Sequence, residues 1–443
     1  MMDEKIVDIF RKSIKSSTAD QTELVCESET FFLTRFAENR VHQNMGRSDS
    51  SIWCRSIIGK KIGVARSNDA TEMGVKDLIK TASDIARNSS EDPEFESLVR
   101  SEKTPITGSY FDNTPIYASR NAGCQINQIV NNIAMESQSN CAGSYQTSGT
   151  TLCAVNSLGT EQYGKTSDYR FSITAVATNG RSGWSQAAGK NIEEFDFSEV
   201  ASRAFDKATF PGDAIKLDSG AYTVILEPDA VANFLLLLAF LGFGGKTIWQ
   251  KRSFMTDKVG QPIMGSNVTI SEDPFHPRIN YMPFDYEGVP RRRVTIVDKG
   301  IATDGVYDSY HAMLAGKKST GNALQPDNNF GPYPKAMVLD GGGSTVDDMI
   351  KSTPSGIYIT RFWYLNYLNP MKTMVTGYTR DGTFLIEDGK VTKPVVDMRV
   401  QQSILEAFSN VEMISGEQRL IPQYGTLMLV PFMKINNLNL SAT

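Results

Sequence analysis

The residues that could do chemistry in this sequence are few and widely spaced. The chain has three histidines, His42, His276 and His311, and no two of them stand at a spacing typical of zinc ligands. Five cysteines occur, the last of them Cys153, without the CxxC spacing of many zinc and redox sites. No GxSxG motif marks a serine nucleophile. We therefore expect neither a metal site nor a recognisable nucleophile in this chain.

Two glycine-rich segments resemble ligand-binding loops only in part. Gly245-Lys246-Thr247 copies the end of a phosphate-binding loop, but Phe240 stands where that motif needs its first glycine, so we expect no nucleotide site. Residues 340–344 end a predicted strand and precede a helix start, where bare N–H groups could hold a carboxylate or a peptide terminus. A tight glycine turn with a capped helix is the interpretation that we favour.

The most informative stretch follows a predicted strand that ends at Leu226. Glu227-Pro228-Asp229 is a typical helix start, because proline at the first helical position loses no hydrogen bond and acids suit the positive end of the helix dipole. From residue 230 to 243 only Asn233 is polar, which predicts a helix buried on all sides. Its apolar run is too short to span a bilayer, so we expect no membrane segment.

Several other segments carry recognisable patterns in a fixed order along the chain. Near the N-terminus Asn39 and Arg40 precede a strand ending His42-Gln43, and Gly59-Lys60-Lys61 separates two strands. Matching segments then follow at residues 251–254, 298–300, 308–310, 319–323 and 375–390. With the apolar helix, this order resembles the TldD/PmbA family of metallopeptidase-related proteins. The resemblance covers nearly the whole chain.

The apolar helix decides which branch of that family the chain resembles. In the TldD branch the helix carries His-Glu-x-x-x-His, which binds zinc together with a later cysteine. The corresponding positions here are Leu236, Leu237 and Leu241, and no cysteine follows Cys153. This departure resembles the PmbA branch, also called TldE, whose members serve as the metal-free partner of a TldD subunit. The resemblance implies no metal and no cofactor in this chain, and zinc only in a TldD-type partner.

The function that the resemblance implies is proteolysis of unfolded or small peptides, in which this chain shapes the peptide cavity. Its partner would be a metal-bearing TldD-type subunit or a second copy of itself. The cavity candidates lie in or near the matched segments and are Lys251, Ser253, Ser319, Thr320, Asn322 and Arg380. Loop hydrogen bonding and capping is the interpretation that we favour for these side chains.

Two other functions stay open at this point. The chain could be an autonomous hydrolase with a site that the sequence does not reveal. It could also be a non-enzymatic binding protein, in keeping with the family's older name as modulators of DNA gyrase. The net charge of −5 and a pI near 5.5 give no field that would attract nucleic acid, so such an effect would act through protein contacts.

The cysteines and the length indicate a reducing compartment and more than one domain. An odd number of cysteines without CxxC spacing is typical of reduced thiols, which predicts a cytoplasmic protein. A chain of 443 residues exceeds what one core usually organises. We expect an α+β fold with a boundary near residue 212, which gives an N-terminal α/β-layered domain over 1–212 and a C-terminal domain over 213–443.

The periodicity of apolar residues predicts different element orders in the two parts. In the first part we expect strands at 29–41, 50–65, 143–156, 161–179 and 183–189, and helices at 70–88, 115–138 and 197–209. In the second part we expect a mostly antiparallel, partly closed sheet of short strands around the buried helix. Those strands are at 268–270, 293–297, 336–339, 356–362, 372–380 and 383–387, with helical signals near 345–351 and 401–408.

Overall fold

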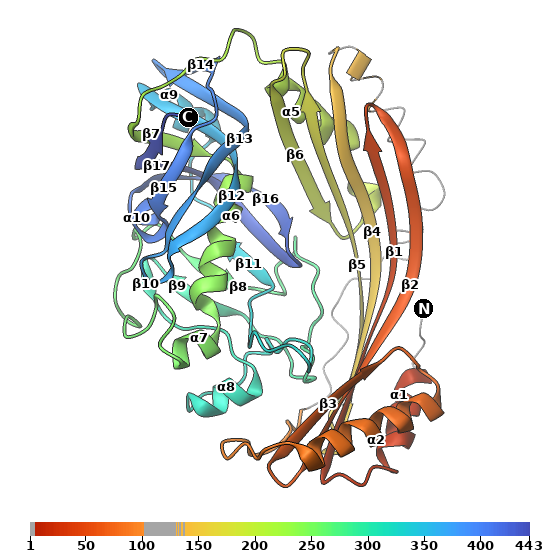
Figure 1. The fold of residues 1–443 in the computed structure, drawn as a ribbon. Helices are drawn as coiled ribbons and strands as arrows, with labels where there is room; N and C mark the ends of the chain where they lie inside the picture. The colour runs from red at the N-terminus through yellow and green to blue at the C-terminus, as the bar shows by residue number, and fades with distance from the viewer. Residues whose placement is uncertain (1–4, 102–129, 131, 133, 136–137) are drawn as a thin grey trace.

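The computed structural model describes residues 5–101, 130, 132, 134–135 and 138–443. Its fold is α+β, as predicted, with two separate β-sheets that lie side by side (Figure 1). The first sheet has six antiparallel strands in the order β3-β2-β1-β4-β5-β6. Their bounds are β1 Gln21–Ala37, β2 Arg40–Ile58, β3 Lys61–Ser67, β4 Asn140–Asn156, β5 Glu161–Val176 and β6 Ser182–Gly189. Most of the helix predicted at 115–138 lies outside the described residues.

Tight turns join the strands of the first sheet. Glu38 and Asn39 both have positive φ, at 49° and 60°, as a two-residue hairpin turn requires. The strand predicted at 29–41 is therefore wrong in its extent, because this turn ends β1 and starts β2 within it. Gly59 has positive φ, and the turn expected there between two strands is confirmed. Gly159 and Gly180 also adopt positive φ, in the turns after β4 and β5.

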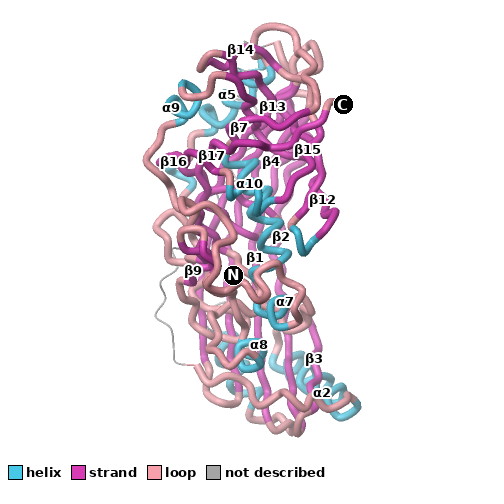
Figure 2. Tube along the Cα trace, turned by 90° about the vertical axis from the view of Figure 1, so that its left-hand side faces the viewer, coloured by secondary structure: helices cyan, strands magenta, loops and turns pink. Residues whose placement is uncertain are grey.

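Helices cover the two ends of this sheet. α1 (Lys5–Ile14) and α2 (Glu72–Asn88) pack at one end, and α5 (Phe197–Ala208) packs on β5 and β6 towards the other (Figure 1). Thr71 caps α2 by accepting a hydrogen bond from the backbone N of Gly74. Seen from the side of the second sheet, β14 and α2 mark opposite ends of the molecule (Figure 2). α2 buries Val75, Leu78 and Ile79, whereas Met73 and Ile85 are exposed.

The second sheet has eleven strands and is partly closed, as predicted. Strands β7, β12, β13, β15 and β17 pair in a ring, because β17 pairs with both β15 and β7. The bounds are β7 Gly220–Leu226, β8 Ile270–Glu272, β9 Val294–Asp298, β10 Ile301–Ala302, β11 Ala336–Leu339, β12 Ser355–Asn369, β13 Met374–Glu387, β14 Lys390–Pro394, β15 Arg399–Ser403, β16 Val411–Gln423 and β17 Thr426–Ser441. The pairs β7 with β12 and β11 with β17 are parallel, and the other pairs are antiparallel.

The buried helix predicted at 228–243 is confirmed. It consists of α6 (Pro228–Leu238) and a π-helical turn, η2 (Ala239–Phe243), and it packs on β12, β16 and β17. Short helices complete the second unit: α7 (Gly245–Trp249), α8 (Ser309–Leu314), α9 (Val346–Lys351) and α10 (Ile404–Ser409). In the described part of the chain, no helix is both long and apolar enough to cross a membrane.

The strand predictions in the second unit are incomplete. The two strands predicted at 372–380 and 383–387 form one strand, β13, in which Asp381 and Gly382 adopt positive φ. The helical signal at 401–408 is wrong in its first part, where β15 pairs with β13. The long strands β16 and β17 were not predicted. Their apolar runs do not alternate with polar residues, because much of β17 is buried on both faces.

Candidate functional site

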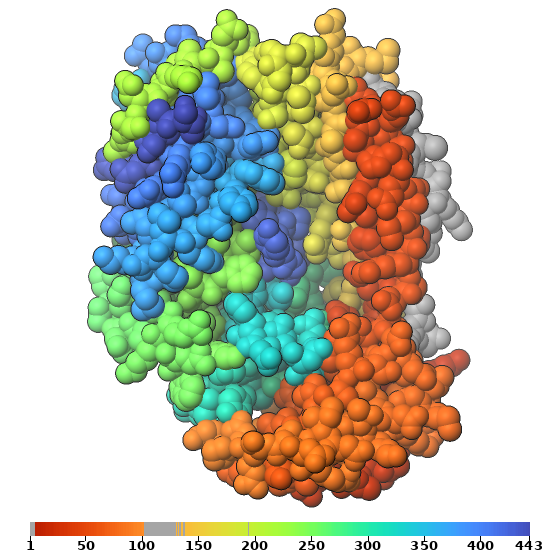
Figure 3. Space-filling model, in the orientation of Figure 1, coloured from red at the N-terminus to blue at the C-terminus, as the bar shows by residue number. Residues whose placement is uncertain are grey.

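A pocket of about 840 Å³ lies where α6 meets the first sheet. We call it the aromatic pocket. Its walls come from α6 and η2, from the irregular second half of β12, from β6 and from the turn between β16 and β17. The space-filling view shows the N-terminal and C-terminal parts packed along each other with a hollow where they meet (Figure 3).

The helical wall holds the three leucines that the sequence analysis aligned with the zinc motif of the TldD branch. Leu236, Leu237 and Leu241 all line the aromatic pocket, and Leu236 and Leu241 are buried. Aliphatic side chains have no lone pair to offer zinc, so this helix face does not fit the metal. Across the described ranges, no group of three or more histidine, cysteine, aspartate or glutamate side chains is arranged to hold a metal ion.

The opposite wall is rich in exposed aromatic side chains. Trp363, Tyr364 and Tyr367 of β12 line it and are 49%, 74% and 36% exposed. The pairing of β12 with β13 is irregular between Trp363 and Asn366, and Tyr364 has a φ of +54°. Because this irregularity breaks the normal alternation of a strand, consecutive side chains reach the same pocket.

Hydrogen bonds between α6 and β6 close one side of the pocket. Asp229, near the start of α6, accepts hydrogen bonds from Trp184 Nε1 at 3.0 Å and Gln186 Nε2 at 2.6 Å, both on β6. Burial raises the pKa of Asp229 from its ordinary value, and the hydrogen bond from Gln186 opposes that rise. Glu227 is ion-paired to Lys207 of α5 at 2.8 Å. The two acids that were expected to serve the helix dipole therefore face β6 and α5.

Arg361 is the cation nearest to the aromatic wall, and it is already engaged. Its Nε donates to Asp381 Oδ2 at 2.7 Å. Its guanidinium lies 4.0 Å from the centre of the Trp184 ring. Asn233 Oδ1 accepts from the backbone N of Phe362 at 3.0 Å. The polar groups of the pocket thus fix its shape, and no nucleophile and base stand together among those named here.

Three of the predicted cavity residues lie together but outside this pocket. Thr320 Oγ1 donates to Asn322 Oδ1 at 2.7 Å, and Asn322 Nδ2 donates to Glu272 Oε1 at 3.0 Å. Ser319 Oγ donates to the backbone O of Tyr307 at 3.1 Å. Thr320 and Asn322 are almost fully buried. This set of bonds secures the loop after α8 against β8.

The other three predicted cavity residues are scattered. Ser253 is buried and donates to Gly242 O at 2.8 Å, so it closes the π-helical turn. Lys251 is exposed and has a φ of +55°. Arg380 is half-exposed on β13, with its guanidinium 5.7 Å from the Trp363 ring centre. None of the six lines the aromatic pocket, and their role in peptide binding stays a prediction.

The sequence contained a signal for the aromatic wall that we did not use. Residues 362–368 combine two tyrosines, a tryptophan, a phenylalanine and two leucines without the polar and apolar alternation of an ordinary strand. A strand that is apolar on both faces must be buried twice or be irregular and exposed. Trp184 and Tyr424 also line the pocket, but they lie in distant segments whose sequences give no comparable signal.

The glycine loop at 340–344 is a tight turn before a capped helix, which confirms the interpretation favoured from the sequence. Thr345 and Asp348 form a reciprocal capping box at the start of α9. The backbone N of Gly342 donates to Ser415 O at 2.9 Å, and that of Ser344 donates to Ile414 O at 3.3 Å. These N–H groups are therefore engaged by β16.

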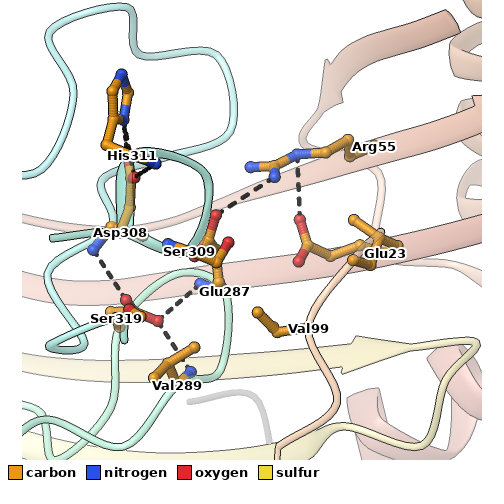
Figure 4. Close-up of polar contacts among 12 residues, drawn as sticks. Glu23, Arg55, Val99, Glu287, Val289, Asp308, Ser309, His311 and Ser319 are labelled. Carbon is orange, nitrogen blue, oxygen red and sulfur yellow. Dashed lines mark hydrogen bonds and ion pairs between the residues drawn. The ribbon is translucent and has the colours of Figure 1, made fainter. Parts of the chain in front are cut away.

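A second junction between the sheets is ionic and buried. Arg55 of β2 lies between Glu23 of β1 and Glu287 of the second unit, and we call these three residues the Arg55 cluster (Figure 4). Arg55 Nε is 3.4 Å from Glu23 Oε2, and its Nη1 is 3.5 Å from Glu287 Oε1. Ser309 donates its backbone N–H to Glu287 Oε2 at 2.9 Å.

Burial controls the protonation of the carboxyl groups at this junction. It raises the pKa of Glu23 to about 7, while Arg55 opposes the rise. Burial and then the charge of Glu287 raise the pKa of the neighbouring Asp285 to about 8. His311 lies beside Asp308, with its Nδ1 2.8 Å from Asp308 Oδ1 (Figure 4). The cluster holds more acids than cations, which suits a pH-sensitive contact more than a catalytic one.

Comparison with known proteins gives one consistent result. Models of the PmbA/TldA metallopeptidase match domain 1 at residues 22–86, the central domain at 117–209 and the C-terminal domain at 219–442. The Metalloprotease PmbA homolog of Haemophilus influenzae is 23% identical over 86% of this chain and 85% of its own length. Metalloprotease PmbA of Escherichia coli O157:H7 is 29% identical over 43% of this chain and 40% of its own length.

Other matches define how far the likeness extends. In several curated relatives the match spans 40% to 50% of the relative's own length. The crystal structure of TldE from Thermococcus kodakarensis has a TM-score of 0.87 to this chain at 21% identity, and the match covers 99% of both chains. At this level of identity the structural likeness establishes the fold.

Proposed function

Because the chain belongs to the PmbA/TldD metallopeptidase family, we propose that it is the non-catalytic, peptide-holding subunit of a TldD/TldE-type peptidase. In this proposal a metal-bearing TldD-type subunit performs the cleavage. The present chain supplies a cavity for unfolded or small peptides.

The observation that carries this proposal is the aliphatic wall of the aromatic pocket. Leu236, Leu237 and Leu241 stand where the resemblance places two zinc ligands and a glutamate. Zinc would polarise a peptide carbonyl and lower the pKa of an attacking water. Leucine side chains supply neither effect, and they offer apolar surface instead. A pocket that keeps its walls without the metal ligands is suited to holding peptide rather than cutting it.

The chemistry of the walls favours an extended peptide with apolar side chains. Two walls are leucine and aromatic surface, and ligand pockets of this volume are usually built in this way. Exposed aromatic side chains such as Tyr364 offer large contact areas with little loss of rotamer freedom. The charged side chains that line the pocket, Asp229 and Arg361, are already engaged by protein partners, so we expect low specificity.

An exposed apolar face beside the pocket is our candidate contact for the partner subunit. Leu368 and Met371 follow the pocket aromatics along the chain and are 51% and 48% exposed, and Tyr378 on the adjacent β13 is 41% exposed. Contiguous apolar patches of this kind mark interaction surfaces. We propose that a TldD-type subunit covers this face, and that a second copy of this chain is the alternative occupant.

The cell compartment is part of the same proposal. The four described cysteines, Cys26, Cys54, Cys141 and Cys153, are buried, and no disulfide joins them. Burial raises the pKa of each of these thiols, which keeps them protonated and slow to react. This supports a reducing compartment such as the cytoplasm.

The proposal is tested by recovering the chain with its partner. Affinity capture of the tagged chain from its own host lysate, followed by mass spectrometry, should return a near-stoichiometric protein that carries His-Glu-x-x-x-His. The copurified pair should cleave an unstructured peptide, and this chain alone should not. Recovery of this chain by itself, with metal-dependent cleavage of the same peptide, would identify an autonomous hydrolase and refute the proposal.

A further inference from the structure

A second pocket, of about 390 Å³, lies at the seam between α5, the end of β6 and β16. We call it the basic pocket. Four cationic side chains line it from segments far apart in the sequence: Lys190, Arg203, Arg278 and Arg419. Gln186 lines both this pocket and the aromatic pocket, so the two meet at that side chain.

The acids of the basic pocket do not balance its cations. Only two, Glu199 and Glu417, are among the lining residues, and their side chains are 68% and 52% exposed. Glu199 is paired to Arg203 Nη1 at 2.5 Å, and Glu417 is paired to Arg419 Nη2 at 3.0 Å. Four positive and two negative charges therefore leave an excess of two positive charges around one small volume.

Donor groups remain available on two of these arginines. Arg278 Nη1 donates to Gln418 O at 2.9 Å, and Arg203 Nε donates to Ser185 Oγ at 3.3 Å. Within the described residues, Arg203 Nη2 and the Nε and Nη2 of Arg278 make no hydrogen bond. Guanidinium groups present their donors in a planar fork that matches the oxygens of carboxylate and phosphate.

The electrostatics of the basic pocket are unfavourable to two of its cations, Arg203 and Arg278. Burial lowers the pKa of Arg203, and the neighbouring charge of Arg419 lowers it further. Burial also lowers the pKa of Arg278. Glu227, the nearest acid behind the pocket, lies 2.8 Å from Lys207 and only 3.8 Å from Arg419. A bound anion would offset this repulsion.

We infer that the basic pocket binds an oxyanion, and that its ligand is the C-terminal carboxylate of a peptide held in the aromatic pocket. This inference rests on the proposed function for the peptide, but the charge arrangement stands without it. Arg203 and Arg278 hold the carboxylate from opposite sides of the seam. The side chain at Gln186 marks the place where the peptide backbone passes from one pocket to the other.

The test compares two peptides that differ only in the terminal group. An N-acetylated tripeptide of phenylalanine, leucine and phenylalanine is titrated into the full-length chain by calorimetry, as the free acid and as the C-terminal amide. The free acid should bind about tenfold more tightly, since a charge-assisted hydrogen bond is worth this much or more. The difference should shrink with added salt, because screening weakens exposed charge pairs.

Variants of Arg203 and Arg278 test whether the preference for the free acid arises in the basic pocket. Arg203→Gln with Arg278→Gln should remove the preference for the acid over the amide, whereas the double lysine variant should keep part of the preference. Arg40→Gln is the matched control, because that side chain is 75% exposed and paired only to the equally exposed Glu38 in the described structure. Inorganic phosphate and acetate, titrated alone, separate a general oxyanion site from one that needs the peptide.

The outcomes distinguish the inference from the proposed function. Equal affinity for acid and amide, with no binding of phosphate, would overturn the inference and leave the peptide cavity intact. Binding of phosphate with equal affinity for the two peptides would retain the anion site but overturn the carboxylate as its ligand. If neither peptide binds while phosphate does, the peptide-holding function fails and the anion site stands.

Discussion

The two junctions between the sheets are built by different chemistry. At the start of α6, Asp229 accepts two hydrogen bonds from neutral donors, Trp184 and Gln186, at one side of the aromatic pocket. At the Arg55 cluster, one guanidinium is shared between two buried carboxyl groups, at N–O distances of 3.4 Å and 3.5 Å. The first junction is satisfied and shapes an open pocket. In the second junction, one arginine faces two buried carboxyl groups, so their charges are not fully balanced.

We infer from this difference that the first junction serves binding and the second serves stability. Trp184 and Gln186 do not titrate, so the two hydrogen bonds keep their geometry while the Asp229 carboxylate stays ionised, which is above a pKa that burial raises. A buried cluster with excess acid depends on protonation, since each carboxylate that ionises there loses hydration without gaining a full partner. We therefore expect the Arg55 cluster to dominate stability, and the aromatic pocket to dominate binding.

The largest effect should come from removing the shared cation. Arg55→Met leaves Glu23 and Glu287 buried without a counter-charge, and breaking such a pair costs about 3 to 5 kcal/mol of unfolding free energy. Denaturant unfolding at pH 7 measures this change. Arg47→Met is the control, because Arg47 lies on the same strand, is 55% exposed and pairs with the surface residue Glu29. Equal losses of unfolding free energy in the two variants would show that the cluster contributes no more to stability than a surface ion pair.

The next effect is a dependence of stability on pH. The pKa of Glu23 is raised by burial from 4.5 to about 7 in the folded chain. Between these values the folded state keeps a proton that the unfolded state has lost. The free energy of unfolding should therefore fall by up to about 3 kcal/mol as pH rises from 4.5 to 7.

A neutral replacement isolates this contribution from that of other acids. Glu23→Gln keeps the shape but has no charge at any pH, so its unfolding free energy should lack this slope. The difference between the two proteins, measured at several pH values, should level off above pH 7. Parallel curves for the two proteins would assign the slope to other groups, such as Asp285 or Glu287.

A smaller loss of unfolding free energy should follow from removing the hydrogen bonds to Asp229 at the start of α6. Asp229→Ala leaves Trp184 Nε1 and Gln186 Nε2 without their acceptor, which costs about 2 kcal/mol. Asp229→Asn should lose less, because an amide oxygen still accepts. Asp347→Ala is the exposed control, and its effect should be close to zero. Thermal unfolding of the three variants would rank them.

The smallest effect on stability should come from the aromatic wall. Tyr364 is 74% exposed, so Tyr364→Ala should change the unfolding free energy by less than about 0.5 kcal/mol. It should still weaken binding of an apolar peptide about fivefold, because an aromatic contact is lost. Tyr378→Ala, on β13 and outside the pocket lining, should bind the peptide normally. Equal binding by both variants would remove the aromatic wall from the site.

Local pattern was enough for much of the fold. The amphipathic helix α2, the glycine turns and the apolar helix α6 were predicted because each depends on side chains close in sequence. The ends of strands were less certain, as the turn at Glu38 and Asn39 illustrates. Its two residues adopt positive φ without glycine, so no strong local signal marked it.

The site was predicted only in part for a similar reason. The three leucines of α6 and η2 were singled out from the sequence, and they do line one pocket. Ser319, Thr320 and Asn322 were chosen because they lie in a segment that resembles the family. They take part in hydrogen bonds to Tyr307 and Glu272 and do not line the pocket. Trp184 and Tyr424 lie in the pocket because the sheets meet there, which no local pattern encodes.

By itself, the sequence determined the family resemblance, the apolar character of α6 and the absence of ligand side chains at Leu236, Leu237 and Leu241, because these depend only on residue types and their order. Only the tertiary structure decided what surrounds that helix. Packing of β6 against α6 brings Trp184 to Asp229, and closure of the second sheet brings the turn after β16 to the same pocket. Contacts between residues far apart in the sequence arise from the burial of whole faces, and that is a property of the folded chain.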